Sequence, residues 1–398
     1  VKSRVELLNR CFTKAIGEYD YKAQYSGVYP IKVNQQRHLV EEILQFGEMH
    51  QMGLECGSKP ELLIALALLE TTDSLILCNG FKDVTYIETA LLSQKLGRNT
   101  IVVVDRMEEL NIIIGASKKL NIKPHIGLRA KLVSQGAGRW VESSGARSKF
   151  GLTPSQIVES VNILKQHNLI DSLELIHFHI GSQIRTEKPY VNLCDKVNSL
   201  VQSLTTKGIA LDMVNLGGGL GINYTDPDSE LIPDFEGFFS VFHKHLNLPH
   251  AINVHFELGR SIVGQCGNLV TKTLFTKGNH IKEFVIVDAG MTDLMRPALY
   301  NGYHKIQNIS SVKPNKIYEV VGPICETGDF LGKDRDLVLE ADDLLAVRSS
   351  GAYGFVMSSN YNTRTRAAEI MVDGEQVHLV RKREELNSLW ELESILPN

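Results

Sequence analysis

One lysine, Lys32, directly follows an apolar β-type run in the segment GVYPIKV at residues 27–33. A strand that is buried along its length has no favourable place for an ammonium group, so this amine either reaches solvent at the strand tip or lies in a cleft. In a cleft, burial and neighbouring positive charge make a lysine amine nucleophilic, and it can form a Schiff base with a carbonyl compound. Lys32 is therefore a candidate for covalent chemistry.

A glycine-rich loop, GGGLG at residues 217–221, follows another apolar run. Backbone N–H groups in such a loop can bind an anion, and Gly217, Gly218 and Gly219 are the candidates. The loop lacks both the GxGxxG spacing of dinucleotide sites and the lysine of a P-loop. A turn that only needs positive φ angles is the alternative interpretation.

Two histidines alternate with apolar residues in the segment HFHIGSQ at residues 177–183. His177 and His179 could ligate a metal together, but no third ligand is evident, and we predict no metal site. Alternatively, His179 lies flat on an aromatic cofactor while Ser182 reaches a phosphate group. For His177 the expected role is that of a buried core histidine.

A carboxylate and a guanidinium lie three residues apart in the segment FELGR at residues 256–260. Glu257 and Arg260 could form a local ion pair. If they serve a site instead, Glu257 can pair with a protonated ring nitrogen and Arg260 with an anion.

The second half of the sequence adds further candidates. In the loop GPICETGD, the thiol of Cys325 can donate a proton and the carboxylate of Glu326 can hold a substrate ammonium group. A buried structural cysteine is the common alternative for Cys325. Arg296 and Tyr300 in MRPALY, and Tyr353 in GAYGF, are more typical of surface or packing positions when each is taken alone.

Taken together, these residues suit one cofactor, pyridoxal phosphate. They comprise a lysine that can form a Schiff base, a phosphate-binding loop, a histidine that can stack on a ring and a carboxylate for a ring nitrogen. The cofactor would supply the electron sink, and the protein would bind and orient it.

The composition excludes several other classes of protein. The 398 residues are 43% hydrophobic and 22% charged with a net charge of -4, so neither nucleic acid nor a membrane surface is expected as a partner. The apolar runs are too short to span a bilayer, and no signal peptide is visible. Six cysteines are scattered singly without a CxxC pair, so zinc and a disulfide framework are not expected, and a reducing cytoplasm fits.

Short apolar runs alternate with amphipathic segments over the first two thirds of the sequence, which predicts a parallel sheet covered by helices on both faces. The predicted strands are residues 27–33, 52–56, 74–78, 100–105, 125–130, 173–180, 212–217 and 252–257. The predicted helices are residues 38–46, 59–70, 83–96, 107–120, 154–168, 187–207 and 235–247. Eight strands favour an α/β fold of the (β/α)8 barrel type over residues 1–264, and an open doubly wound sheet is the alternative.

Catalytic residues of such barrels lie at the carboxyl ends of the strands. The residues that end or follow predicted strands are Lys32, Glu55, His179, those of the glycine loop, and Glu257 with Arg260. A barrel would therefore bring these side chains to one rim.

From about residue 265 the pattern changes to strands that are joined by tight turns, with a hairpin expected at DGEQ. Residues 265–398 are therefore predicted to form a second, mostly β domain.

The motifs resemble those of the barrel-type (fold type III) pyridoxal-phosphate decarboxylases of basic amino acids, whose fold is shared with alanine racemase. Residues 1 to about 180 resemble biosynthetic arginine decarboxylase in YPIKVNQQRHLVEEI, GLECGSKPEL, LILCNGFKD and GAGRWVESSGARSKFGLT. Residues from about 210 to 398 resemble diaminopimelate decarboxylase in NLGGGLGINY, FELGRSIVG, FVIVDAGMTDLMRPALY, GPICETGDFLGKDRDL and GAYGFVMSSNYNTRTRAAEIMVDG. A natural recombinant, a designed chimera and an assembly artefact would each give this split.

The resemblance implies that Lys32 bonds the cofactor and that Cys325 returns a proton to the substrate carbon after carbon dioxide leaves. The residues that would hold the cofactor are Lys32, His179, Ser182, Gly217, Gly218, Gly219, Glu257, Arg260 and Tyr353. The residues that would bind substrate are Arg260, Arg296, Tyr300, Glu326 and Tyr353. The active site of the family is shared across a homodimer, so Cys325 and Glu326 would reach the partner's cofactor.

Two departures from these families are visible. Both families have a segment before the first helix that contributes strands to the β domain, and its absence from this sequence predicts a bare edge on that sheet, a liability for association. The helical insertions typical of arginine decarboxylase are missing from the second half.

The two halves imply different substrates, which differ in their distal groups. Meso-diaminopimelate ends in a carboxylate and an ammonium group, which Arg296 and Glu326 can bind together. Arginine ends in a guanidinium alone, which a fixed arginine would repel, and loss of one partner of a desolvated charged contact costs about 2–5 kcal/mol. We therefore expect decarboxylation of meso-diaminopimelate to L-lysine, with decarboxylation of L-arginine to agmatine as the alternative.

A racemase, a cofactor carrier and an inactive regulatory homologue would share this fold. A carrier would lack the β domain, and a racemase would need a second base opposite Lys32. The intact Lys32 and Cys325 argue against an inactive partner. The sequence therefore favours a decarboxylase.

Overall fold

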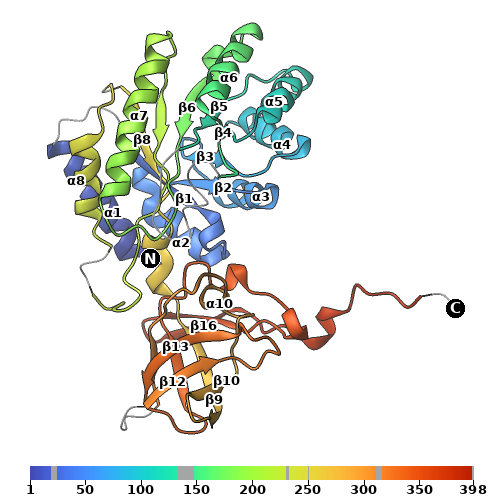
Figure 1. Cartoon of the computed structure of the whole chain (residues 1–398). Coiled ribbons are helices and arrows are strands. Elements are labelled where there is room, and N and C mark those ends of the chain that lie inside the picture. The colour runs from blue at the N-terminus through green and yellow to red at the C-terminus, as the bar shows by residue number, and fades with distance from the viewer. Residues whose placement is uncertain (19–24, 133–147, 230–232, 250, 311–315, 397–398) are drawn as a thin grey trace. The chain divides into compact units, whose positions relative to one another are not determined.

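The computed structural model describes residues 1–18, 25–132, 148–229, 233–249, 251–310 and 316–396 (Figure 1). The chain forms two compact units. The barrel unit comprises Val1–Ile222 and Glu230–Ile262, and the β unit comprises Asn223–Ser229 and Val263–Asn398. Residues 136–147 of the motif GAGRWVESSGARSKFGLT, part of the resemblance to arginine decarboxylase, lie outside the described residues.

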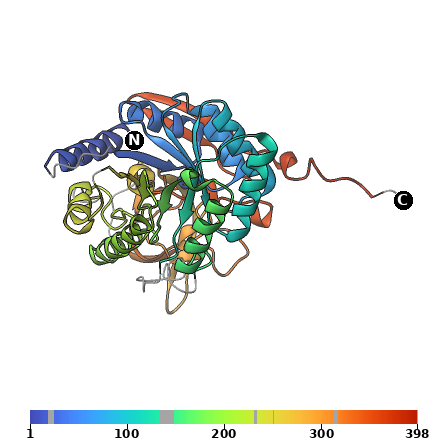
Figure 2. The same cartoon turned by 90° about the horizontal axis from the view of Figure 1, so that it is seen from above.

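Eight parallel strands of the barrel unit close into a barrel in the order β1 to β8, with helices around them (Figure 2). The predicted (β/α)8 barrel is confirmed, and the open sheet is excluded. The strands are β1 (Tyr25–Pro30), β2 (Gly53–Cys56), β3 (Leu75–Cys78), β4 (Asn99–Val104), β5 (Ile126–Arg129), β6 (Leu173–His177), β7 (Met213–Asn215) and β8 (Asn253–Phe256). The helices are α1 (Lys2–Glu18), α2 (Arg37–Gly47), α3 (Lys59–Leu68), α4 (Val84–Lys95), α5 (Met107–Leu120), α6 (Pro154–Gln166), α7 (Lys188–Thr206), α8 (Phe235–His245) and α9 (Arg260–Val263).

Six of the eight strands end before the predicted residue, and the difference is largest for β1 and β6, whose expected ends at residues 33 and 180 were wrong. β1 ends at Pro30, which has no N–H to donate to the ladder, and Lys32 lies in the 3-10 turn that follows, Ile31–Val33. β6 ends at His177, after which the backbone leaves the ladder and turns at Gly181, whose φ is +114°. Lys32 and His179 therefore lie beyond their strands.

The barrel interior is filled by alternate residues of the strands, as the pleat of a β-strand requires. The side chains that pack together there are Val28, Leu75, Leu77, Ile101, Val103, Leu175 and Met213. Because successive side chains point to opposite faces, residues two positions further along each strand also point inward. This alternation sets which residues can form a site at the carboxyl end.

β8 is held from outside by aromatic packing. The ring of Phe256 lies 4.8 Å from that of Phe242 and 5.2 Å from that of Phe238, both on α8. Phe12 of α1 lies 4.5 Å from Phe239 in the same cluster. Buried aromatic pairs of this kind stabilise a fold beyond the area they bury, so the strand that precedes Glu257 is firmly placed.

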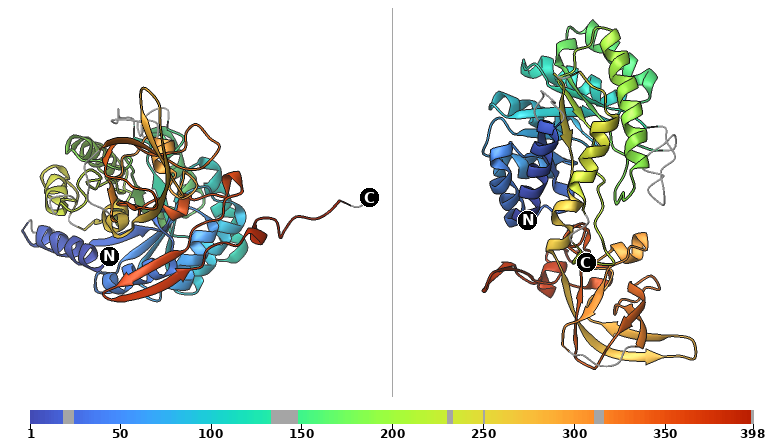
Figure 3. Two further views of the ribbon diagram at one scale, coloured as in Figure 1. Left: turned by 90° about the horizontal axis from the view of Figure 1, so that it is seen from below. Right: turned by 90° about the vertical axis from the view of Figure 1, so that its left-hand side faces the viewer.

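The β unit contains a six-stranded sheet in the order β11-β14-β9-β10-β12-β13 and a separate β15–β16 hairpin (Figure 3). Its elements are β9 (Leu269–Gly278), β10 (Glu283–Val287), α10 (Arg296–Tyr300), β11 (Ile306–Asn308), β12 (Lys316–Val321), β13 (Phe330–Leu337), β14 (Leu344–Val347), β15 (Glu369–Asp373) and β16 (Gln376–Arg381). The hairpin turn falls at the predicted DGEQ, with Gly374 at a φ of +58°. Within the ranges that the structure describes, no helix has both the length and the apolar character needed to cross a bilayer.

Candidate active site

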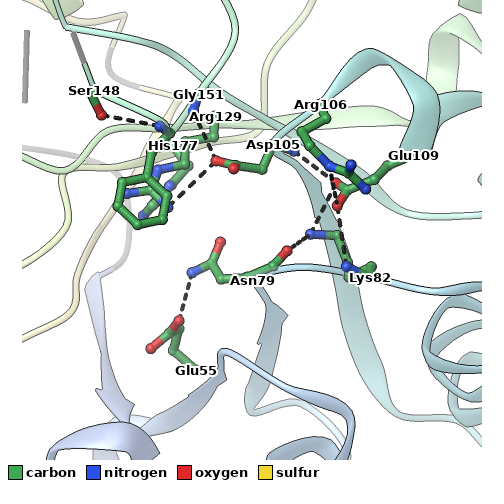
Figure 4. Close-up of polar contacts among 12 residues, drawn as sticks. Glu55, Asn79, Lys82, Asp105, Arg106, Glu109, Arg129, Ser148, Gly151 and His177 are labelled. Atoms are coloured by element: carbon green, nitrogen blue, oxygen red, sulfur yellow. Dashed lines mark hydrogen bonds and ion pairs between the residues drawn. The ribbon is translucent and has the colours of Figure 1, made fainter. Parts of the chain in front are cut away.

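A layer of polar side chains lies above the apolar interior of the barrel, at the carboxyl ends of the strands. Each belongs to the inward-facing alternation of its strand or directly follows that strand. Figure 4 shows Glu55, Asn79, Asp105, Arg129 and His177 of this layer. The layer comprises Glu55, Asn79, Asp105, Arg129, His177, Asn215 and Glu257. Among the described residues, no three His, Cys, Asp or Glu side chains gather as metal ligands.

Lys32 and Glu55 form an ion pair at the ends of β1 and β2. Lys32 Nζ lies 2.9 Å from Glu55 Oε2, and the lysine side chain is 44% exposed whereas that of Glu55 is 0% exposed. Asn79 Nδ2 donates a hydrogen bond to Glu55 Oε1 at 3.0 Å. The amine is therefore accessible from the barrel mouth while its counter-charge is held below it.

Glu257 is a buried carboxylate that is surrounded by nitrogen atoms. Oε1 accepts hydrogen bonds from Asn215 Nδ2 at 3.0 Å and Asn79 Nδ2 at 3.3 Å. His177 Nε2 also lies 3.1 Å from Oε1, but it lacks the geometry of a hydrogen bond. Burial opposes the charge of Glu257, yet His177 and Lys32 outweigh burial and hold the pKa of this carboxyl below its usual range. The contacts found among the described residues converge on Oε1, which leaves Oε2 for a cationic donor.

His179 presents a neutral imidazole at the same rim. Burial, together with the charges of Arg129 and Lys32, lowers its pKa to about 3. Its Nδ1 is buried and has no hydrogen-bond partner among the described residues, although part of the residue is accessible. A neutral flat ring of this kind can stack on another aromatic ring without a charge penalty.

The glycine loop after β7 is pressed against neighbouring backbone. Gly217 has a φ of +67°, and a Cβ there would lie 2.5 Å from the carbonyl oxygen of Phe178. A Cβ on Gly218 would lie 2.1 Å from the carbonyl oxygen of Glu257, and Gly219 has a φ of +119°. Only glycine fits this path, which brings bare backbone to the rim.

Some of the loop's hydrogen-bonding groups already have partners. The Gly217 N–H donates to Asn215 Oδ1 at 2.8 Å, and the carbonyl oxygen of Gly219 accepts from the Ile184 N–H at 2.8 Å. The prediction that Gly217 binds an anion through its N–H therefore has a competitor within the chain.

Arg260 and Ser182 meet beside this loop. The guanidinium donates from Nε at 3.2 Å and from Nη2 at 3.1 Å to Ser182 Oγ. Because the hydroxyl accepts from Arg260, its own proton is available to an anion. The two side chains thus add a cation and a donor to the glycine loop.

In the β unit, Arg296 is held in one orientation. Its Nη1 lies 2.7 Å from His304 Nε2, and its guanidinium carbon lies 4.5 Å from the centre of the Tyr224 ring. His304 Nδ1 lies 2.8 Å from the carbonyl oxygen of Arg348, which can only accept. Nδ1 must therefore carry the proton, and Nε2 accepts from Arg296. Tyr300 closes the same short helix, α10.

Cys325 and Glu326 lie exposed on a loop between β12 and β13. The loop is fixed from inside by the buried Asp329, whose carboxylate accepts from the Met291 N–H at 2.6 Å and from the Ile324 N–H at 2.9 Å. An exposed thiol on a fixed loop does not match the alternative of a buried structural cysteine.

Tyr353 has a φ of +55°. This conformation is strained for a bulky residue and persists only where the surrounding structure enforces it, which is frequent at functional sites.

Residues 6–264 match the model of the pyridoxal binding domain of the pyridoxal-dependent decarboxylases. The chain belongs to this family. A diaminopimelate decarboxylase of Vibrio cholerae is 38% identical over 391 residues, which are 97% of this chain and 89% of that protein.

The relatives of this chain carry two names. A biosynthetic arginine decarboxylase of Nostoc sp. is 50% identical over 224 residues, or 56% of this chain and 33% of that protein. The chain spans about a third of the length of the curated arginine decarboxylases it matches first. The solved diaminopimelate decarboxylase of Helicobacter pylori, complexed with L-lysine, superimposes with a TM-score of 0.85 at 30% identity over 98% of this chain and 95% of that one. Both families that the sequence resembles are thus among its relatives.

The barrel residues fit the pyridoxal phosphate of the family. The site offers an accessible amine on Lys32 and a buried carboxylate with one oxygen left over on Glu257. It also offers a neutral imidazole on His179, whose Nδ1 has no partner in the described part of the chain, and a loop that admits no Cβ. These groups match the aldehyde, the ring nitrogen, the ring face and the phosphate of the cofactor.

Sequence reasoning missed the contribution of four polar residues to this layer. These residues end or follow barrel strands, a position that the predicted barrel already marked as chemically active; they are Asn79, Asp105, Arg129 and Asn215. Asparagine beside glycine is also typical of turns, and that ordinary interpretation hid Asn79.

Proposed function

We propose that this protein is a pyridoxal-phosphate-dependent amino acid carboxy-lyase whose substrate is meso-diaminopimelate. Bound pyridoxal phosphate supplies an aldehyde that takes the substrate amino group and a ring that accepts the electrons released when the carboxylate leaves. Membership of the decarboxylase family and the ion pair between Lys32 and Glu55 support the activity.

The proposed roles in the barrel follow from the contacts of each side chain. Lys32 bonds the cofactor, and Glu55 keeps the amine oriented toward the barrel mouth. Glu257 holds a proton on the ring nitrogen. Its Oε1 already accepts a hydrogen bond from Asn215, so Oε2 is the oxygen that accepts from the ring nitrogen. His179 covers the ring face as a neutral imidazole.

The phosphate would be held beside the glycine loop. Ser182 donates its hydroxyl proton, since Arg260 already donates to its oxygen. Gly218 and Gly219 let the loop lie against the backbone of Glu257 and Gly181, where a Cβ would clash, and the loop would present its backbone to the phosphate.

The observation that carries the substrate assignment is the fixed guanidinium of Arg296. His304 and Tyr224 hold it in one orientation, so it can meet a carboxylate with a paired hydrogen bond. A distal carboxylate occurs in diaminopimelate and not in arginine. Coverage of 89% of the Vibrio cholerae diaminopimelate decarboxylase, against about a third of the arginine decarboxylases, supports the same choice.

We also propose a homodimer with shared active sites. Cys325 would return a proton to the substrate carbon and Glu326 would hold the distal ammonium, each in the partner's site. Their exposure on a loop that Asp329 fixes supports this role. Tyr353, in its strained backbone conformation, and Tyr300 are proposed to contact cofactor and substrate. The six cysteines are free thiols, which supports a reducing compartment such as the cytoplasm.

Arginine decarboxylation is the second candidate, and the 50% identity to the Nostoc arginine decarboxylase favours it. The deciding experiment measures carbon dioxide release from meso-diaminopimelate, L-arginine, L-ornithine and L-lysine side by side, with pyridoxal phosphate supplied. We expect release from diaminopimelate. Release from L-arginine alone would replace the substrate assignment, and release from none of the four would remove the proposed activity.

A further inference from the structure

Asn79 lies between the two carboxylates of the barrel site. Its Nδ2 donates to Glu55 Oε1 at 3.0 Å and to Glu257 Oε1 at 3.3 Å. An amide nitrogen carries two hydrogens, so it can serve both carboxylates at once. The reverse amide orientation would set its oxygen against two anions, so the chemistry fixes which atom faces them.

The two carboxylates need such a donor because both are buried. Glu55 and Glu257 lie within hydrogen-bond distance of one nitrogen atom, and Glu55 is 0% exposed. Two carboxylates at such range in a poorly solvated site tend to take up a proton on one of them. A shared N–H donor favours the ionised form of both.

The backbone of Asn79 is held on both sides. Its N–H donates to the carbonyl oxygen of Cys56 at 2.8 Å, and its own carbonyl accepts from Tyr86 Oη at 3.4 Å. The next residue, Gly80, has a φ of +70°, and a Cβ there would lie 2.0 Å from the carbonyl oxygen of Gly57. Asn79 therefore cannot move far without breaking the contact between the ends of β2 and β3.

A buried ion pair holds the far side of the same turn (Figure 4). Lys82 Nζ donates to the carbonyl oxygen of Gly80 at 2.6 Å and lies 3.2 Å from Glu109 Oε2. Both charged side chains are 0% exposed. This support shows that the turn which presents Asn79 is rigidly built.

The side-chain oxygen of Asn79, Oδ1, indicates that the hydrogen bonds donated by Nδ2 are the reason for an asparagine at this position. Its Oδ1 is buried and has no hydrogen-bond partner in the part of the chain that the structure describes. A buried acceptor without a partner destabilises a fold, and an apolar side chain would avoid that cost. The two donated hydrogen bonds are what an apolar residue could not supply.

We propose that Asn79 is a positioning residue that couples the carboxylate beside Lys32 to the carboxylate of Glu257, so that one amide sets the orientation and charge of both. The inference rests on the proposed function, in which Lys32 bonds pyridoxal phosphate and Glu257 faces its ring nitrogen. Asn79 itself touches neither the reacting atoms nor the substrate in this assignment.

The test compares Asn79→Asp and Asn79→Ser with the wild type and with Asn9→Asp, a matched control at a buried asparagine on α1. Asn79→Asp keeps the shape but replaces the shared donor with a third carboxylate, and Asn79→Ser keeps a single donor. The readouts are the pH dependence of the absorbance of the lysine-bound cofactor, acetylation of Lys32 in cofactor-free protein by mass spectrometry, and kcat and KM.

We expect Asn79→Asp to move the absorbance midpoint by one pH unit or more and to slow Lys32 acetylation at pH 8 at least threefold. Its kcat should fall at least tenfold with KM within threefold, and should partly recover as the pH falls and the new carboxyl gains a proton. Asn79→Ser should lie between this variant and the wild type, and Asn9→Asp should match the wild type in all three readouts.

Failure of the proposed coupling and failure of the proposed function give different results. If the wild type binds pyridoxal phosphate at Lys32 and Asn79→Asp and Asn79→Ser leave the midpoint and the acetylation rate unchanged, the coupling is refuted while the proposed function stands. If borohydride reduction of the wild type with pyridoxal phosphate does not trap the cofactor on Lys32, the proposed function itself fails. If Asn9→Asp shifted the absorbance midpoint as far as Asn79→Asp does, the coupling would also be overturned, because any buried asparagine replaced by aspartate would then have the same effect.

Discussion

The substitution Glu109→Gln tests the buried charge pair beneath the site. Glu109 Oε2 lies 3.2 Å from Lys82 Nζ and accepts from the Asp105 N–H at 3.0 Å, while Oε1 accepts from the Lys82 N–H at 3.3 Å. Glutamine keeps the size and one acceptor oxygen but removes the negative charge. Lys82 would then be a buried ammonium without a counter-ion, a state that proteins avoid by deprotonating the amine.

The expected cost follows from that deprotonation. Burial already lowers the pKa of Lys82, and the charge of Glu109 opposes the shift. Losing a proton from a lysine of ordinary pKa costs about 1.36 kcal/mol for each pH unit below about 10.4, which is about 4.6 kcal/mol at pH 7 and about 1.9 kcal/mol at pH 9. Loss of one partner of a buried pair typically costs about 3–5 kcal/mol, in agreement with the first figure.

Urea unfolding of the cofactor-free protein, followed by far-ultraviolet circular dichroism at pH 7 and pH 9, measures this cost. The matched control is Glu88→Gln, because Glu88 pairs with Lys119 at 2.7 Å on the surface, where the lysine side chain is 66% exposed. Loss of a surface pair costs about 0–1 kcal/mol at either pH. Equal losses in the two variants, or a loss in Glu109→Gln that does not shrink at pH 9, would refute the reasoning.

Three further predictions concern other residues. Lys32→Ala should abolish both the absorbance of the bound cofactor and carbon dioxide release, and turnover by this variant would contradict the assignment. Arg296→Ala should raise KM for meso-diaminopimelate about 30-fold or more, which corresponds to a lost charged contact of about 2–5 kcal/mol. It should have little effect on residual turnover of L-arginine, and equal losses for the two substrates would count against the argument from the fixed guanidinium. Burial opposes the charge of Glu384, but hydrogen bonds from Arg366 and Asn360 lower its pKa to about 2. The ionised carboxylate therefore stabilises the fold above about pH 4.3, and this stabilisation is lost as the pH falls toward 2. Calorimetry between pH 5 and pH 2 should therefore show a shallower loss of stability for Glu384→Gln than for the wild type, and parallel curves would exclude this contribution.

The barrel was predictable because its strands are short apolar runs, and four of the described helices, α3, α4, α6 and α8, begin at a side-chain cap. Thr153 and Gln156 form a capping box ahead of α6, and Asp83 accepts from the Tyr86 N–H at the start of α4. The predicted ends of β1 and β6 failed for local reasons. Pro30 cannot donate to the ladder, and the turn at Gly181 takes the chain out of the sheet.

The site was predictable where residue type and position agreed, and not elsewhere. Lys32 and Glu257 are charged residues next to buried strands, which marks them at once. Asn79 and Asn215 are uncharged, and asparagine is so frequent in turns that its type alone carries no signal. Their importance depends on which carboxylate oxygens they meet on neighbouring strands and across the barrel, those of Glu55 and Glu257, and that depends on strand register.

His177 has a role at the site in addition to the core position expected for it. It is a buried histidine, as expected, but its Nε2 lies 3.1 Å from Glu257 Oε1, so it also acts on the charge of the site. Its inward orientation follows from Leu175, two residues earlier, which packs in the apolar interior. The same alternation that builds the core thus selects the residues of the polar layer.

The division of the chain into two units suggests how substrate choice can change without loss of the cofactor chemistry. The proposed cofactor contacts, Lys32, His179 and Glu257, lie in the barrel unit, where hydrogen bonds to Glu55 and from Asn215 hold Lys32 and Glu257 in place. The fixed guanidinium of Arg296 lies in the β unit, held there by His304 and Tyr224. A substitution at His304 should therefore alter KM for a substrate with a distal carboxylate while the absorbance of the bound cofactor stays unchanged. Under the proposed function, this independence is what would let a barrel similar to that of arginine decarboxylases act on a substrate with a different distal group.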